Sequence, residues 1–278
     1  MLPPPSLTIS IVLFRTDTRL LLECLNSLAQ AVDIALQNNS LGIVRLVLVD
    51  NNPDTTSVNG VDELPAGILA SFHNIEWVRG HGNIGYGRGH NLAILQSTSD
   101  YHLVLNPDVV LATDAIIAAL DFMQRYPQAG LLAPAVQGAD GTIDYLCKRY
   151  PAVADLLLRG FAPAGLQRLF KSRLARYEMR DVINAKLVWD VPLVSGCFMW
   201  LRGSVVRSIN GFDPAYFLYF EDYDLSIRIA AAKARTVYVP SVCIVHYGGH
   251  AARKGWHHIA MFMRAALRFY NTHGWRLL

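Results

Sequence analysis

The first half of the chain alternates short apolar runs with helical patterns, and this alternation restricts the fold more than any other feature. Residues 7–14 form a continuous apolar and β-branched run, which is typical of a strand covered on both faces. Further strands are expected at 43–49, 75–78 and 101–105, and helices at 20–36, 92–96 and 113–126. Strands that alternate with helices predict an α/β fold, a mostly parallel sheet flanked by helices.

The second half is less regular and predicts a smaller, mixed region. Strands are expected at 131–136, 194–201, 236–239 and 242–245, and helices at 204–209 and 225–232. Residues 151–186 combine several helix breakers with a cluster of arginines, so we expect a mobile loop with helical pieces there. The whole chain is interpreted as one domain with a C-terminal tail.

Composition excludes several classes of protein. The 278 residues are enough for one large core, and 52% of them are hydrophobic, yet no run reaches the ~18 apolar residues that span a bilayer. The N-terminus lacks the basic region of a signal peptide, and a net charge of +3 argues against nucleic-acid binding. The four scattered cysteines fit buried thiols in a reducing compartment. We therefore expect a cytoplasmic protein that rests on a membrane.

Acidic and amide side chains directly follow two of the predicted strands. Asp50 and Asn51 end one strand, and Asn106 and Asp108 end another. Ligands of parallel sheets bind beyond the carboxyl ends of the strands, where Asp50 can accept the imide N–H of uracil or thymine. Asp108 can hold a hard cation that carries a diphosphate. Each segment also suits a simple turn or helix cap, and the residues alone leave both interpretations open.

A glycine-rich segment at residues 80–91 opens with the spacing G-x-G-x-x-G, and Asp100 lies near the position of a ribose-binding acid. A dinucleotide fold, however, places that turn after its first strand, and here it follows the third. Asp100 also precedes the fourth predicted strand instead of ending it, which argues against a dehydrogenase. The glycines indicate close approach of the backbone to a ligand, such as a nucleotide sugar.

Three carboxylates stand directly behind the aromatic run 216–220. If residues 225–232 are helical, these acids lie at a helix N-terminus, where the helix dipole favours negative charge. They could therefore simply cap the helix, although one cap needs only one acid. Ionised carboxylates beside apolar rings are costly unless they are paired, metal-bound or used in chemistry. The candidates for chemistry are Glu221, Asp222 and Asp224.

Taken in order, these motifs resemble glycosyltransferase family 2, the inverting nucleotide-sugar transferases of the GT-A fold, and its rhamnosyltransferase-like branch in particular. The resemblance covers residues 7–250. It rests on Ser10-Ile11-Val12, Val49-Asp50-Asn51, Asn83-x-Gly85 through Asn91, Asn106-Pro107-Asp108, Ser195-Gly196, Gly211-Phe212-Asp213, Glu221-Asp222-x-Asp224 and His246.

The resemblance implies a role for each of these residues. Asp222 would be the catalytic base, supported by Glu221 and Asp224, and Asp108 and His246 would hold Mg²⁺ or Mn²⁺. The residues implied at the nucleotide sugar are Asp50, at the base, with Asn51, Asn83, Gly85, Asn91, Asn106, Ser195 and Gly196. The family's usual D-x-D motif is Asn106-Pro107-Asp108 here, so its first acid is missing, which leaves the affinity and identity of the metal open.

The implied activity is metal-dependent, inverting transfer of a sugar from a nucleotide diphosphate to a hydroxyl of a glycan or lipid-diphosphate-linked acceptor, as in O-antigen or other cell-surface polysaccharide synthesis. The resemblance favours L-rhamnose from dTDP-rhamnose, with UDP-sugars next. One alternative is a nucleotidyltransferase, although the basic glycine-rich loop that such enzymes carry after the first strand is missing. Another is an inactive nucleotide-sugar-binding module of the same fold.

On this interpretation, residues 1–130 form the nucleotide-sugar-binding half of the GT-A domain, 131–250 the acceptor and catalytic half, and 251–278 a basic amphipathic helix. The aromatic run 216–220 could stack on a sugar ring. One face of the C-terminal helix is expected to pack on the core; the alternative is an interfacial helix that docks on a membrane. That face comprises Trp256, Ile259, Ala260, Met263, Leu267 and Tyr270, with Arg264 and Arg268 beside it.

Overall fold

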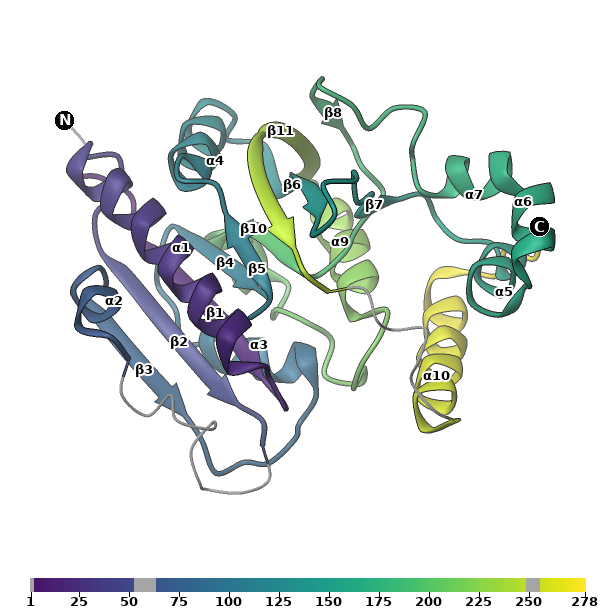
Figure 1. The fold of residues 1–278 in the computed structure, drawn as a ribbon, viewed down its shortest axis with the longest axis horizontal. Coiled ribbons are helices and arrows are strands. Elements are labelled where there is room, and N and C mark those ends of the chain that lie inside the picture. The colour runs from purple at the N-terminus through teal and green to yellow at the C-terminus, as the bar shows by residue number, and fades with distance from the viewer. Residues whose placement is uncertain (1–2, 53–63, 249–255) are drawn as a thin grey trace.

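The computed structural model describes residues 3–52, 64–248 and 256–278, and a large mixed sheet forms its centre (Figure 1). Across this sheet the strands are β3 (Asn74–Val78), β2 (Val44–Asp50), β1 (Leu7–Leu13), β4 (Tyr101–Leu105), β10 (Phe198–Arg202), β6 (Ala129–Gly138), β11 (Arg235–His246) and β5 (Val109–Leu111), with β8 (Val188–Trp189) also paired to β11. A second, two-stranded sheet pairs β7 (Cys147–Lys148) with β9 (Leu193–Val194).

The parallel part of the sheet is the N-terminal part. Strands β3, β2, β1 and β4 all run parallel, and β11 runs parallel to β6. Only β10 reverses direction between β4 and β6, while β5 and β8 are antiparallel partners of β11 at the far side. The predicted α/β architecture with a mostly parallel sheet is confirmed.

Helices cover both faces of the sheet. One face carries α1 (Thr18–Gln37), α2 (Ala66–Ala70) and α4 (Ala115–Arg125), whose apolar residues join those of β1 and β2 in the main core cluster. The opposite face carries α3 (Tyr86–Ile94), α8 (Gly203–Ser208) and α9 (Glu221–Ala231), which form a second cluster. At one end of the molecule lie α5 (Val153–Phe161), α6 (Ala164–Leu169), α7 (Lys171–Tyr177) and α10 (Trp256–His273) (Figure 1).

Four predicted segments differ from the structure. The helix expected at 92–96 begins earlier, inside the glycine-rich segment, because α3 covers Tyr86–Ile94. Residues 151–186 contain α5, α6 and α7, so they are more regular than the expected loop. The strand expected at 194–201 is interrupted at Ser195-Gly196-Cys197, between β9 and β10. The two strands expected at 236–245 are one strand, β11, with an irregularity in its pairing to β6 between Val239 and Cys243. None of the helices in the described part of the chain is long and apolar enough to cross a membrane.

Helix α10 packs on the core, as predicted, but mostly through a different face. Its buried residues are Ala265, Ala266, Phe269 and Tyr270, of which only Tyr270 belongs to the predicted face. The rest of that face faces outward or is only partly covered: Trp256 is 87% exposed, Met263 44% and Leu267 48%. The helix therefore carries apolar side chains on two faces, and only one of them is covered by the described residues.

Candidate active site

The carboxylate of Asp50 lies at the end of β2, only 4% exposed. Its Oδ1 accepts hydrogen bonds from the backbone N–H and the side-chain amide of Asn52, at 3.0 and 2.7 Å. The Nε of Arg79 lies 3.9 Å from Oδ2, and the Arg79 guanidinium stacks over the Trp77 ring at 4.1 Å. The strand end thus presents a fixed acid beside a cation and a flat aromatic surface.

The next residue, Asn51, connects this strand end to the glycine-rich segment. Its Nδ2 donates to the Gly85 carbonyl at 3.0 Å and to Asn83 Oδ1 at 3.4 Å, and the Gly85 N–H donates to the same Asn83 oxygen at 3.1 Å. Asn51 Oδ1 is buried and has no hydrogen-bond partner among the described residues. Gly85 has φ +93°, and a Cβ there would collide with the Phe217 carbonyl, so the position requires glycine.

Tyr86 joins the two halves of the site, although the motif analysis did not single it out. Its hydroxyl lies 2.5 Å from the Gly196 carbonyl oxygen and 3.0 Å from Asn106 Oδ1. The Gly196 N–H in turn donates to Asp222 Oδ2 at 2.9 Å. Asn106, Gly196 and Asp222, three predicted site residues from distant parts of the sequence, are therefore linked through one phenol.

Asp222 lies in the first turn of α9 and is half-buried. Its Oδ1 accepts the Tyr223 N–H at 2.8 Å, while Gly196 serves Oδ2. Burial raises the pKa of the Asp222 carboxyl, and these two backbone donors partly oppose the rise. Two backbone N–H groups fix the carboxylate in place and favour its ionised form.

Glu221, directly before Asp222, is buried at 4% exposure, and its Oε2 has no hydrogen-bond partner within the described ranges. Burial raises the pKa of Glu221, and the charge of the adjacent Asp222 raises it further. Because Asp222 has the two backbone donors, Asp222 carries the negative charge and Glu221 holds the proton.

The entry to α9 is strained. Tyr219 and Phe220 both adopt left-handed backbone conformations, with φ +73° and +64°, a region that costs a non-glycine residue about 1 kcal/mol or more. Aromatic packing on α10 holds them there, with ring centroids 5.5 Å apart for Tyr219 and Phe262 and 5.1 Å for Phe220 and Phe269. The conformation of Asp222 therefore depends on the C-terminal helix.

Asp224 points away from Asp222. Its carboxylate is 1% exposed and fully engaged: Oδ2 accepts from Arg228 Nε at 2.6 Å, and Oδ1 lies 2.8 Å from His273 Nε2 of α10. We therefore assign Asp224 a positioning role, and its predicted support of Asp222 stays a prediction. Within the aromatic run, Tyr216 and Phe220 are buried against α10, whereas Phe217 is 39% exposed, so stacking of the run on a sugar ring stays a prediction for Phe217.

Asp108 and His246 meet because β5 pairs with β11, which sets Val109 opposite His246. His246 Nε2 lies 3.5 Å from Asp108 Oδ1, and Nδ1 lies 3.8 Å from Asp144 Oδ2. Burial lowers the pKa of His246, but the two carboxylates outweigh it and raise the pKa to about 9. Asp144, which the sequence motifs do not include, places a carboxylate near the imidazole nitrogen that faces away from Asp108, although that nitrogen has no hydrogen-bond partner within the described ranges.

This pair suits a divalent cation. Asp108 Oδ1 is buried without a hydrogen-bond partner in the described part of the chain, and a carboxylate with an imidazole is a donor set that Mn²⁺ and related ions accept. A Cβ at Gly248 would lie 2.5 Å from His246 Nε2 and 2.7 Å from Asp108 Oδ2, so glycine leaves the pair open. Among residues 3–52, 64–248 and 256–278, no group of three or more His, Cys, Asp or Glu residues could hold a metal by itself.

The Asp108 pair and Asp222 act on the same buried groups. Burial raises the pKa of the Cys197 thiol well above its usual range, and the charges of Asp108, Asp144 and Asp222 raise it further. Burial, and then nearby charges that include Asp222 and Asp108, likewise raise the pKa of the Tyr86 hydroxyl. In the hydrogen-bond network, the Tyr86 hydroxyl connects Gly196, which holds Asp222, to Asn106, two residues before Asp108.

Two predicted donor-site residues mainly organise the backbone. The Asn91 amide accepts from the Phe212 N–H and donates to the Phe212 carbonyl, each at 2.8 Å, and the residue is buried. It positions the Gly211-Phe212 turn, so we do not assign it a direct contact with a donor. Ser195 donates its backbone N–H to Leu146 at 3.0 Å and precedes Gly196 at the interruption between β9 and β10.

A family model described as "Glycosyltransferase like family 2" matches residues 4–259. The chain is 29% identical over 223 residues to an N-acetylglucosaminyl-diphospho-decaprenol L-rhamnosyltransferase of Mycobacterium tuberculosis, covering 75% of this chain and 68% of the relative. It is 26% identical over 194 residues to the rhamnosyltransferase WbbL of Escherichia coli K12, covering 67% and 69% of the two chains.

Solved structures share the fold. GalNAc-T7 with UDP, GalNAc and Mn²⁺ superposes with a TM-score of 0.63 at 11% identity, over 96% of this chain and 48% of that one. The mannosyltransferase PcManGT of Pyrobaculum calidifontis, with GDP-Man and Mn²⁺, gives 0.56 at 16% identity, over 95% and 65%. The chain thus spans about half the length of the first structure and just under two thirds of the second, and the likeness shows the GT-A fold.

Proposed function

Because this chain belongs to the glycosyltransferase-like family 2, we propose that it transfers L-rhamnose from dTDP-rhamnose to a hydroxyl of a lipid-diphosphate-linked glycan during cell-surface polysaccharide synthesis. The names of the mycobacterial and E. coli relatives support the sugar, and the former supports the acceptor. One observation carries the proposal: Asp222 is held by two backbone N–H groups, and the Tyr86 hydroxyl connects one of these donors, Gly196, to Asn106, two residues before Asp108.

The donor would lie across the carboxyl ends of β1, β2 and β4. Asp50 would accept the imide N–H of the thymine, and the unpartnered Oδ1 of Asn51 would accept a further N–H or O–H group. Asp108 and His246 would hold Mg²⁺ or Mn²⁺, which supplies charge neutralisation for the departing nucleoside diphosphate. Asn106, already engaged by Tyr86, would set the edge of this site instead of the missing first acid.

Asp222 would act as the base. The acceptor hydroxyl attacks the anomeric carbon from the face opposite the diphosphate, so one C–O bond forms as the other breaks and the configuration inverts. The hydroxyl proton passes to the Asp222 carboxylate. The raised pKa of this carboxyl makes it a stronger base than an exposed aspartate, and the Gly196 N–H keeps Oδ2 oriented. Glu221 would stay protonated and keep a second negative charge out of the site.

A donor panel tests the proposal. We expect dTDP-rhamnose with Mg²⁺ or Mn²⁺ to raise the melting temperature more than UDP- or GDP-sugars do, since ligands stabilise only the folded state. We also expect slow release of dTDP without an acceptor. Stabilisation without any turnover would favour the inactive binding module, and pyrophosphate release from a nucleoside triphosphate and a sugar phosphate would favour a nucleotidyltransferase.

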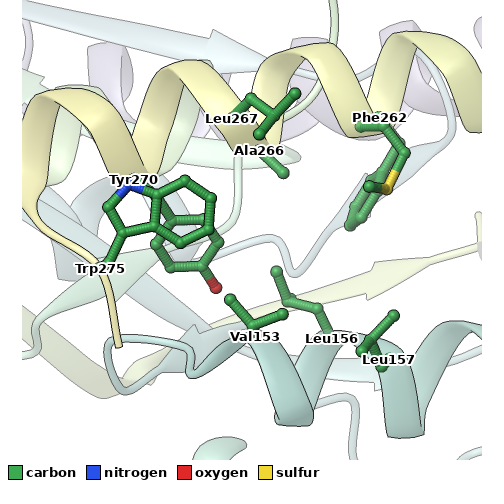
Figure 2. Close-up of a pocket in the computed structure, with 9 residues that line it drawn as sticks. Val153, Leu156, Leu157, Phe262, Ala266, Leu267, Tyr270 and Trp275 are labelled. Carbon is green, nitrogen blue, oxygen red and sulfur yellow. The ribbon is translucent and has the colours of Figure 1, made fainter. Parts of the chain in front are cut away.

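We further propose that the protein contacts the inner face of the cell membrane through α5, α6 and α10. Figure 2 shows an apolar groove in which Val153 and Leu156 of α5 face Ala266 and Tyr270 of α10. Its volume is about 60 Å³, and the exposed side chains of Leu157, Met263, Leu267 and Trp275 border it. Four exposed cations of α6, α7 and the C-terminal residues have no ion-pair partner in the described ranges, which suits anionic lipid: Arg168, Lys171, Arg176 and Arg276.

Vesicle co-sedimentation tests this contact. Because α10 is part of the core, a point variant is preferable to removal of the helix. We expect Leu267→Asp to pellet less than the wild type with phosphatidylglycerol vesicles, whereas Leu95→Asp, at a comparably exposed leucine on the other side of the fold, should pellet normally. Equal pelleting of all three proteins would contradict a membrane contact at this surface.

A further inference from the structure

A second, larger pocket lies on a different face of α10 from the apolar groove. Its volume is about 640 Å³. One wall is α10, another is the segment that leads toward α9, and α3 contributes a single arginine. The lining residues that carry the argument are Arg88, His257, Arg264 and Arg268, together with Tyr216 and Phe217.

The charge of this pocket is positive. No carboxylate is among the described residues that line it. Arg268 is partly neutralised, because its Nη2 lies 2.6 Å from Asp213 Oδ2. Arg88 donates only its Nε, to the Pro214 carbonyl, and keeps its full charge. Arg264 is exposed and has no ion-pair partner within the described chain. A site with this many fork-shaped cations favours a multiply charged, oxygen-rich anion.

One wall of the pocket belongs to the segment that leads to the proposed catalytic base. Phe217, in its wall, accepts the Tyr86 N–H at 3.0 Å, and the Tyr86 hydroxyl reaches Gly196, which holds Asp222. The same segment continues through the strained Tyr219-Phe220 turn directly into Glu221 and Asp222. A molecule that presents a hydroxyl to Asp222 would therefore place its neighbouring group beside this segment.

We propose that this basic pocket binds the diphosphate of a lipid-linked acceptor, an inference that rests on the proposed function. The donor's own diphosphate belongs to the Asp108–His246 pair, so the protein would hold two diphosphates at two separate sites. The apolar groove lies on the other exposed face of the same helix and is bordered by Met263 and Leu267. One helix would thus receive the charged head of the acceptor and face the membrane that contains its tail.

Farnesyl diphosphate is a suitable probe, because it carries the same head and a short isoprenoid tail. We would measure its affinity by calorimetry with Mg²⁺ and saturating dTDP present, so that the donor site is filled. We expect the wild type to bind it, and Arg264→Ala to bind at least about tenfold more weakly, since a charge-assisted hydrogen bond is lost. Arg125→Ala, which removes an exposed arginine in the last turn of α4, should bind like the wild type.

Several outcomes would overturn the assignment. Equal affinity in Arg264→Ala and the wild type, measured on variants with unchanged melting temperature, would remove the pocket from acceptor binding. Binding of farnesyl diphosphate that occurs only when dTDP is left out would assign the probe to the donor site. If farnesol binds as tightly as farnesyl diphosphate, the interaction is apolar and the diphosphate is not recognised. If binding of phosphatidylglycerol vesicles depends on Arg264 as strongly as binding of the probe does, the pocket is a general headgroup site. If the wild type binds the probe in an Arg264-dependent way but does not turn over dTDP-rhamnose, the result would instead count against the proposed reaction.

Discussion

The acids on the donor side and the acid on the acceptor side are held in place in different ways. Asp50 ends a central parallel strand, and Asp108 lies three residues beyond the end of another, so the hydrogen-bonded ladder sets their positions. Asp222 begins a helix after two left-handed residues, and its geometry depends on Gly196 and on α10. A site acid can therefore be positioned by its own strand or by tertiary contacts, and the two should fail differently when mutated.

The largest effect, a loss of sugar transfer with unchanged dTDP binding, is expected from Asp222→Asn. The amide cannot take a proton from the acceptor hydroxyl, so we expect transfer to fall by about 10³-fold, within the usual range for loss of a general base. Binding of dTDP should not change, because the strand-end residues are intact. Single-turnover transfer and calorimetry with dTDP measure the two effects, and near-normal transfer by this variant would remove Asp222 from its proposed role.

Asp108→Ala should produce the opposite pattern. The change removes one of the two protein donors that we assign to the metal, so we expect metal-dependent donor affinity to fall by about 10- to 100-fold. Metal-independent binding of the base, through Asp50, should persist. Titration of dTDP with and without Mn²⁺ checks this, and an unchanged gain in affinity on adding metal would place the cation elsewhere.

The same contrast explains what could be predicted from the sequence. Strands β1, β2 and β4 were located to within a residue, because buried parallel strands read as continuous apolar runs. The acids at their ends followed directly. Tyr86 could not be found in this way, because its partner Gly196 is 110 residues away and no local pattern connects them. Its place inside the glycine-rich segment was the only available signal.

The roles of the acidic residues at the start of α9 and the packing face of α10 are harder to predict from sequence, for related reasons. Glu221, Asp222 and Asp224 look equivalent in sequence, but the helix turns each carboxylate in a different direction. Arg228, one turn after Asp224, was a usable hint that Asp224 is paired. Helix α10 has apolar residues on two faces, so periodicity alone could not tell which face meets the aromatic run. The strained turn at Tyr219-Phe220 exists only because that packing holds it.

A smaller effect, on kcat and stability, should show whether α10 positions Asp222. His273→Ala removes the contact between α10 and the buried Asp224, which keeps only Arg228. We expect a loss of about 1–3 kcal/mol in unfolding free energy and about a tenfold lower kcat, with dTDP affinity unchanged. Asn271→Ala, an exposed change on the same helix, is the control. Wild-type kcat in His273→Ala would show that α10 does not position Asp222.

The two regions should also respond to pH with opposite signs. Beneath the donor side, Ser10 Oγ lies 2.7 Å from His90 Nδ1 and 2.8 Å from His102 Nε2, all buried. Burial, and then the charge of Arg207, lowers the pKa of His102 to about 3, so the unfolded state binds more protons below pH 6.5. This histidine therefore destabilises the fold as pH falls through that range. Glu221 has a raised pKa, so it destabilises the fold as pH rises above its unfolded value of 4.5.

Denaturant unfolding at pH 5.5 and 7.5 separates these contributions, the smallest effects expected. Relative to the wild type, His102→Gln should become more stable by about 1.4 kcal/mol on going from pH 7.5 to 5.5, because the variant no longer excludes a proton. Glu221→Gln should instead become more stable, relative to the wild type, on going from pH 5.5 to 7.5. The variant lacks the buried carboxyl that releases its proton on unfolding in this range. The wild-type profile alone is uninformative, since the two slopes oppose each other between pH 4.5 and 6.5. If stability relative to the wild type changes with pH in the same direction in both variants, the pKa values of His102 and Glu221 are not shifted in the way that their surroundings require.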